Sequence, residues 1–160
     1  MSQLAELAKS VAKAQPACAV CGFGLWLPVW RLQVSEVGLY DDARFPGRAI
    51  VSLTEHFDDF DTVPEELMCE FMADVQQVSR SLRTVTGAPR VNVAILGNQE
   101  SHVHAHVIPR HPEQEARPKN SPWQDPRPHS KLPPAELQTI SARLRDSLET
   151  ERSHSRCVGA

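Results

Sequence analysis

The sequence predicts an α+β domain whose sheet is largely antiparallel, and three observations predict it. One long amphipathic helical pattern, over residues 64–86, has β-like runs before it and after it. Two β-like runs, 91–96 and 102–108, are separated by a short segment containing Gly-Asn, which is typical of an antiparallel hairpin. A second helical pattern over 134–149 follows them. Strands before and after one long helix, with a terminal helix, indicate the α+β class.

The first part of the chain is expected to supply a short helix and several extended segments. Residues 2–14 place Leu, Ala and charged residues at helical spacing, so a helix is expected there, ending before a proline. Residues 25–40 are rich in Leu, Trp and Val and are predicted to be extended, with an interruption at Pro28. The segment 41–47 has the composition of a turn, and 48–53 is predicted to be a buried strand.

The helix predicted over 64–86 carries the signals expected at both of its ends. Pro64 suits the first turn, and Glu65 and Glu66 favour the positive end of the helix dipole. Gly87 is expected to cap the C-terminal end. A single apolar stripe at spacings of three and four is expected to face the core: Leu67, Phe71, Val75, Val78, Leu82 and Val85.

A proline-rich segment and a helix complete the domain. Between residues 109 and 134, 8 of the 26 residues are proline. We expect this arm to be ordered, because the large side chain of Trp123 needs a surface on which to pack. The helix over 134–149 places its apolar residues on one side. The chain is therefore predicted to be one domain over 1–150 with a disordered tail over 151–160.

The composition argues against several classes of protein. The formal charge of −3 does not fit the basic surface of a nucleic-acid-binding protein. No apolar run approaches the roughly 20 residues that span a bilayer, and charged residues near the N-terminus interrupt any signal-peptide pattern. Four cysteines are too few for a disulfide framework in a chain this long. We therefore expect a cytoplasmic protein with neither nucleic-acid nor membrane partners.

Three histidines in strict alternation are the strongest chemical signal in the chain. His102, His104 and His106 alternate with Val103, Ala105 and Val107. In a strand the apolar set faces a core while the three imidazoles share the other face. Such a row could hold a metal ion, bind a phosphate, or present a nucleophile with its helpers. A merely solvated row fits the flanking hydrophobic residues poorly.

The run His102-Val-His-Ala-His-Val-Ile matches the motif of the histidine triad (HIT) superfamily, which the chain resembles over about residues 18–130. The segments Arg44-Phe-Pro-Gly-Arg48 and Leu96-Gly-Asn98 are most similar to a bacterial branch that includes diadenosine polyphosphate hydrolases. The resemblance implies a five-stranded, mainly antiparallel sheet with one long helix packed on it and a C-terminal helix. It also implies a homodimer.

The resemblance further implies cleavage of a nucleoside 5′-phosphate derivative at the α-phosphorus. His104, the middle histidine, is then the nucleophile, and a nucleotidyl-histidine forms and is hydrolysed. His106 and His102 complete the catalytic set, with His106 placed to donate to the phosphate or the leaving group. A nucleotidyltransferase or phosphorylase of the same superfamily is an alternative. So are a non-catalytic nucleotide-binding protein and a metal-binding protein that uses all three histidines.

Polar side chains near the triad are candidates for binding the substrate. Gln99 and Ser101 can offer an amide and a hydroxyl to phosphate oxygens, and Asn98 and Asn92 are further candidates. Glu100 departs from the family pattern, because a carboxylate there repels an anionic substrate unless it points away.

One further pair of residues has two interpretations of equal weight. Asp41 and Asp42 lie where the family places an acidic residue on the ribose hydroxyls, and they also fit a solvated turn.

Cys18 and Cys21 form a Cys-x-x-Cys pair, which fits either a metal site or a redox centre. Gly22 and Gly24 follow directly, so the pair does not open a helix as a thioredoxin-like centre requires. Some triad proteins complete a zinc site with a histidine at the end of the mid-chain strand and with the first triad histidine. The resemblance thus implies structural zinc on Cys18, Cys21, His56 and His102, with no organic cofactor.

Overall fold

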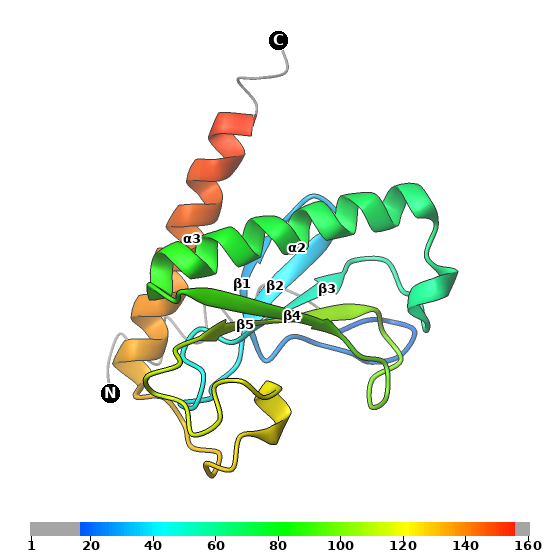
Figure 1. Ribbon diagram of the computed structural model, residues 1–160. Coiled ribbons are helices and arrows are strands. Elements are labelled where there is room, and N and C mark those ends of the chain that lie inside the picture. Colours follow the sequence, from blue (N-terminus) through cyan, green and yellow to red (C-terminus); the bar gives the residue numbers. More distant parts are fainter. Residues whose placement is uncertain (1–16, 156–160) are drawn as a thin grey trace, which may run out of the picture.

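The computed structural model describes residues 17–155 as a five-stranded antiparallel sheet with two helices on one face (Figure 1). The elements are β1 Leu27–Arg31, β2 Ser35–Leu39, β3 Ala49–Leu53, α2 Glu65–Thr86, β4 Arg90–Ile95, β5 His104–Arg110 and α3 Pro134–Ser155. Two short 3₁₀ turns, η1 Phe60–Thr62 and η2 Pro122–Gln124, lie between them. The strand order is β1-β2-β3-β5-β4. The α+β fold class and the five-stranded sheet are confirmed, while the helix expected over 2–14 lies outside the described residues.

The two faces of the sheet follow the period-two alternation of its strands. On one face, Val37, Val51, Ala105 and Val107 pack in one core with the apolar side of α2 and with residues of α3. The other face carries His104 and His106, because neighbouring residues of a strand point to opposite sides. The predicted burial of Val103, Ala105 and Val107 is confirmed. In Figure 1 the proline-rich arm, coloured yellow to orange, lies on the side of the sheet opposite α2.

Residues 25–40 form two strands, and the break lies at a place that the sequence does not indicate. Pro28 lies inside β1, where a register shift follows it, and β1 is an edge strand that tolerates a missing N–H group. The turn comes instead at residues 32–34. Buried Asp74 of α2 accepts hydrogen bonds there from the backbone N–H of Val34 at 3.0 Å and from the Ser35 hydroxyl at 2.7 Å. A side chain about 40 residues away along the chain therefore positions this turn.

The antiparallel pairing of the predicted hairpin is confirmed, but the histidine strand begins later than predicted. β4 and β5 pair antiparallel and are joined by the eight residues 96–103 instead of a tight Gly-Asn turn. His102 precedes β5. Val103 N donates to Phe57 O at 3.0 Å, and Val103 O accepts from Leu53 N at 3.1 Å. These bonds tie residue 103 to the last residue of β3 and to the segment after it, and the regular ladder starts at His104.

The C-terminal helix corrects the predicted boundary of the tail. α3 runs to Ser155, so residues 151–155 are helical and do not belong to a disordered tail. Residues 156–160 lie outside the described part of the chain. Within residues 17–155, neither helix combines the length and apolarity needed to cross a bilayer.

Candidate active site

The histidine face of the sheet opens into a cavity of about 620 Å³. His104 and His106 line it, with ring centroids 5.1 Å apart. The other walls come from residues 22–26, from Tyr40 at the end of β2, and from the segment 96–100 before the triad. The cavity volume falls in the range typical of small-molecule sites. His104 and His106 therefore form the floor of a pocket that can enclose a ligand.

One hydrogen bond determines which nitrogen of His104 is free. Its Nδ1 lies 2.6 Å from the backbone carbonyl oxygen of His102, and a carbonyl can only accept. Nδ1 therefore carries the proton, and Nε2 retains the lone pair of a nucleophile or base. The ring of Phe23 stacks on both His104 and His102, at centroid distances of 5.3 Å and 4.9 Å. His104 is buried and held in one orientation and one tautomer.

His106 is kept in its neutral form by its surroundings. Burial is the main cause, and repulsion from a protonated His104 and from the Arg48 guanidinium adds to it, so that the pKa of His106 falls to about 4. The indole of Trp123 packs edge-on against this imidazole, with centroids 5.3 Å apart. Its Nδ1 is buried without a hydrogen-bond partner among the described residues. A neutral imidazole can donate one N–H to a bound ligand while its other nitrogen accepts.

This pKa shift predicts a loss of stability in acid. The unfolded chain protonates His106 below about pH 6.5, whereas the folded chain does so only near pH 4. The contribution of His106 to the free energy of unfolding is therefore complete above about pH 6.5, and it is lost as the pH falls toward 4. We expect the free energy of unfolding to drop by about 1–2 kcal/mol from this group once solvent screening is allowed for.

Urea unfolding of the wild type and of His106→Asn at about pH 7 and about pH 4.5 tests this expectation. Asparagine at residue 106 does not titrate. Between the two pH values the free energy of unfolding of the variant should therefore fall by about 1–2 kcal/mol less than that of the wild type. Equal pH dependence of the two proteins would contradict the assignment. The exposed His129, changed to asparagine, provides the matched control.

Two cysteines and two histidines meet at one end of the histidine face. The potential ligand atoms of Cys18, Cys21, His56 and His102 all lie within 4.8 Å of one another. Cys18 Sγ is 3.6 Å from His56 Nδ1, and Cys21 Sγ is 3.5 Å from His102 Nδ1. The two Nδ1 atoms are 3.4 Å apart. This group has the donor atoms to hold a metal ion.

The outer nitrogens of both histidines are already engaged. His102 Nε2 lies 2.8 Å from the carbonyl oxygen of Leu53, and His56 Nε2 lies 3.1 Å from a carboxylate oxygen of Asp58. Each Nε2 therefore donates, which leaves each Nδ1 lone pair directed at the group. Hydrogen bonds from the backbone of Cys21 and Val20 lower the pKa of the Cys18 thiol to about 6, which favours the thiolate that a metal requires.

The pattern of residues 33–113 matches that of the HIT domain family, over just half of the chain. The chain belongs to the HIT family. A HIT-like protein of Methanocaldococcus jannaschii is 29% identical over 73 residues, which span 42% of this chain and 56% of the archaeal protein. This chain thus matches little more than half the length of that relative.

Solved structures share the HIT fold. The histidine triad protein blr8122 of Bradyrhizobium japonicum has a TM-score of 0.69 and 24% identity, covering 76% of this chain and 90% of its own. A zinc-bound histidine triad protein of Mycobacterium smegmatis has a TM-score of 0.61 and 20% identity, covering 93% and 96%.

The HIT site brings some of the predicted substrate residues together and not others. Asn98 and Gln99 line the cavity with His104, as does the exposed Glu100. Ser101 is exposed and is not part of the wall. Asn92 lies further along β4, where it accepts a hydrogen bond from Arg110. The segment before the triad therefore contributes two amides and a carboxylate to the wall of the cavity, but no hydroxyl.

The two aspartates expected at the ribose do not reach the cavity, which corrects that expectation. Asp42 is fully buried and binds the guanidinium groups of Arg44 and Arg48. Asp41 accepts a hydrogen bond from the backbone N–H of Leu132 at 2.6 Å. Both carboxylates hold the segment after β2 against its neighbours. The alternative of a solvated turn is wrong for Asp42, because its carboxylate has no contact with solvent.

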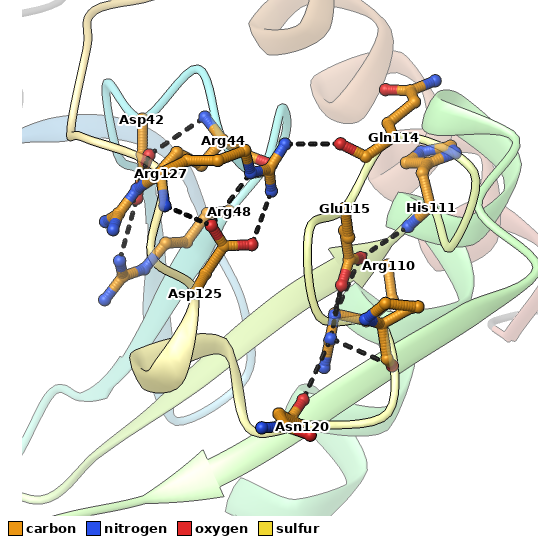
Figure 2. Close-up of polar contacts among 11 residues, drawn as sticks. Asp42, Arg44, Arg48, Arg110, His111, Gln114, Glu115, Asn120, Asp125 and Arg127 are labelled. Carbon is orange, nitrogen blue, oxygen red and sulfur yellow. Dashed lines mark hydrogen bonds and ion pairs between the residues drawn. The ribbon is translucent and has the colours of Figure 1, made fainter.

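Ion pairs fix the arm that carries Trp123 (Figure 2). Arg110 at the end of β5 pairs with the buried carboxylate of Glu115. Arg127 pairs with Asp125 at 2.8 Å and donates to the backbone oxygen of Arg44 at 3.1 Å. η2, which holds Trp123, lies between these two anchors, and the arm is ordered as predicted.

Two residues of the site were not identified from the sequence. Phe23 stacks on His102 and His104, and Arg48 lines the cavity beside His106. Trp123, which was expected to pack on a surface, lines the cavity as well. The Arg48 position carried a signal, because Pro46-Gly47 and a buried strand flank it. Gly47 has a φ of 86°, and a Cβ on it would lie 2.7 Å from Thr86 Cγ2 at the end of α2. The loop is therefore packed tightly, and it delivers Arg48 to the histidine face.

Proposed function

We propose that this HIT protein binds a nucleotide derivative and cleaves it at the α-phosphorus through a covalent bond to His104. One observation carries the proposal. His104 Nδ1 donates to the His102 carbonyl at 2.6 Å, so the unprotonated Nε2 belongs to an imidazole that lines the 620 Å³ cavity. An imidazole with a fixed tautomer beside a ligand-sized pocket is the arrangement that nucleophilic catalysis requires.

The steps follow from the positions of the side chains. Nε2 of His104 forms a bond to the α-phosphorus, and the bond from phosphorus to the leaving group breaks with its electron pair on the leaving group. The His102 carbonyl stabilises the imidazolium that results, because it accepts from Nδ1–H throughout. Water then attacks phosphorus and releases a proton to the solvent, the electron pair of the P–N bond returns to Nε2, and the nucleoside monophosphate leaves. The amides of Asn98 and Gln99 and the N–H of His106 line the cavity as donors to the oxygens of the attacked phosphate.

We further propose that Cys18, Cys21, His56 and His102 bind structural zinc. A tetrahedral zinc ion places S and N ligands about 3.5 Å apart and two N ligands about 3.3 Å apart. The observed separations of 3.6, 3.5 and 3.4 Å agree with these values. Four protein ligands would leave no position for water, so a bound metal would fix His102, whose carbonyl orients His104. The zinc-bound relative from Mycobacterium smegmatis supports the choice of metal.

The homodimer and the cytoplasmic location stay predictions. β4 is an edge strand, and Val93 on it and Leu96 after it are exposed, which supports pairing with a second copy.

The activity is tested by product analysis with purified, zinc-loaded protein. Diadenosine tetraphosphate, adenosine 5′-phosphoramidate and adenylyl sulfate are each incubated with it, with and without inorganic phosphate. Release of AMP supports the proposal. Release of ADP only when phosphate is present would identify a phosphorylase instead. AMP binding without any product would identify a non-catalytic nucleotide-binding protein.

A further inference from the structure

Arg48 is a largely buried cation in the wall of the cavity, and the steps at His104 do not use it. Its side chain is 13% exposed, and it lines the same cavity as His104 and His106. The residue stands immediately before β3, where its backbone oxygen accepts a hydrogen bond from Tyr40 N at 2.8 Å. Burying a guanidinium is costly unless it is paired and hydrogen-bonded, and the carboxylate that pairs with Arg48, that of Asp42, is shared with Arg44.

The register of the sheet places Arg48 beyond His106. Ser52 pairs with His104, and Ile50 pairs with His106. Arg48 precedes Ile50 by two residues, so it lies on the same face one step further along, about 6–7 Å past the level of His106. Along this face the order is therefore His104, then His106, then Arg48.

Two aromatic rings and one carboxylate hold the Arg48 guanidinium in place. Its central carbon lies 4.7 Å from the centroid of the Tyr40 ring and 5.8 Å from that of Trp123. Nη1 donates to Asp42 at 3.1 Å, and Figure 2 shows the two side chains together. A guanidinium held in this way loses little freedom when a ligand binds.

The guanidinium retains both charge and hydrogen-bonding capacity. Asp42 is shared with Arg44, so two cations face one carboxylate. Among the described residues, the Arg48 guanidinium makes one hydrogen bond, from Nη1 to Asp42, and its Nε is buried without a partner. Glu100 also lines the cavity, but it is exposed, and water screens its charge far more than that of a buried cation.

We propose that Arg48 binds a second anionic group of the substrate, next to the phosphate that His104 attacks. The preferred leaving group then carries a phosphate or another oxyanion, as in a polyphosphate, and is not a neutral amine. This inference rests on the proposed function for the position of the attacked phosphate. When the P–O bond breaks, the electron pair stays on the departing oxyanion, which needs no proton and whose charge Arg48 balances. A departing amine, in contrast, must acquire a proton.

Anion binding tests the inference without any need for turnover. Inorganic tripolyphosphate is titrated into the zinc-loaded full chain, followed by calorimetry and by the emission of Trp123, assigned with Trp123→Phe. We expect binding to the wild type and binding weakened ~10- to 100-fold in Arg48→Met, because charge-assisted hydrogen bonds are lost. Arg44→Met is the matched control, since it removes the same charge from the same carboxylate outside the cavity.

Each outcome has one meaning. Binding that depends on Arg48 but not on Arg44 supports the inference. No binding to the wild type, or equal weakening in both variants, overturns it. If Arg48→Met does not fold, Arg48→Lys takes its place in the titration. Lysine retains the positive charge but lacks the planar fork of the guanidinium. The affinity of this variant for tripolyphosphate should therefore lie between that of the wild type and that of a site with no charge at residue 48.

Turnover separates this inference from the proposed function. With diadenosine tetraphosphate, kcat/KM should fall ~10- to 100-fold in Arg48→Met, and with adenosine 5′-phosphoramidate it should fall less than ~3-fold. Equal loss for the two substrates overturns the inference while leaving the covalent mechanism in place. Anion binding that depends on Arg48 in a protein that releases no AMP rejects the proposed function and leaves the anion site in place.

Discussion

Replacing His104 with asparagine should abolish AMP release without unfolding the protein. The variant retains an amide that can donate to the His102 carbonyl, but it lacks the ring nitrogen that bonds to phosphorus. We expect kcat/KM to fall by at least ~10³-fold, because removing a covalent nucleophile leaves only binding and electrostatic assistance. The measurement is AMP release from the best substrate of the panel, with circular dichroism to confirm the fold.

Two controls make this result specific. His129 is exposed on the arm, and His129→Asn makes the same chemical change away from the cavity. In the wild type, rapid quenching followed by intact mass measurement should show protein carrying one nucleotidyl group, and His104→Asn should show none. A folded His104→Asn protein that retains turnover within about tenfold of the wild type would exclude His104 as the nucleophile.

Replacing Cys18 with serine should remove the metal and lower both stability and activity. The change removes one of four converging ligands, and three ligands hold zinc far less tightly. We expect the purified variant to contain little zinc and its Tm to fall by about 10 °C or more, because metal binding in such a site stabilises the folded state. Elemental analysis and thermal unfolding measure the two effects, and a chelator should reproduce them in the wild type.

The loss should also extend to the chemistry, because the metal site and the cavity share a wall. Phe23 follows Cys21 by two residues and stacks on His104 at a centroid distance of 5.3 Å. Freeing this segment loosens the face that holds the nucleophile, so kcat should fall with zinc content.

Cys69→Ser is the matched control for the metal site, since Cys69 is exposed on α2. It should retain full zinc content. His104→Asn should also retain zinc, and metal lost from that variant would favour the alternative in which all three triad histidines bind the ion.

Patterns within a few residues of one another predicted most of the fold. The stripe from Leu67 to Val85 indicated the face of α2 that packs on the sheet, and Gly87 ends that helix in the left-handed conformation as expected. The alternation of histidine with apolar residues predicted which side chains of β5 face the core. These predictions succeed because helix and strand periods are properties of the local backbone.

Features that depend on distant partners were predicted less well. The break between β1 and β2 depends on Asp74, and the start of β5 depends on bonds from Val103 to Leu53 and Phe57. The residues next to these positions in the sequence do not indicate which distant residues will bond to them. The resemblance to the HIT family did anticipate one distant arrangement, because the structure brings His56 and His102 to the cysteine pair.

The sequence by itself determined the α+β class, through the order of its helical and extended patterns. It also determined the apolar faces and the common face of the histidines, because these follow from the period of a single element. Only the tertiary structure decided which groups surround the triad. It directs Asp42 to two arginines and away from the cavity, and it places Arg48 between Tyr40 and Trp123. The charge and the partners of a buried side chain depend on residues that fold in from elsewhere, and for Arg48 these include an arm about 75 residues further along the chain.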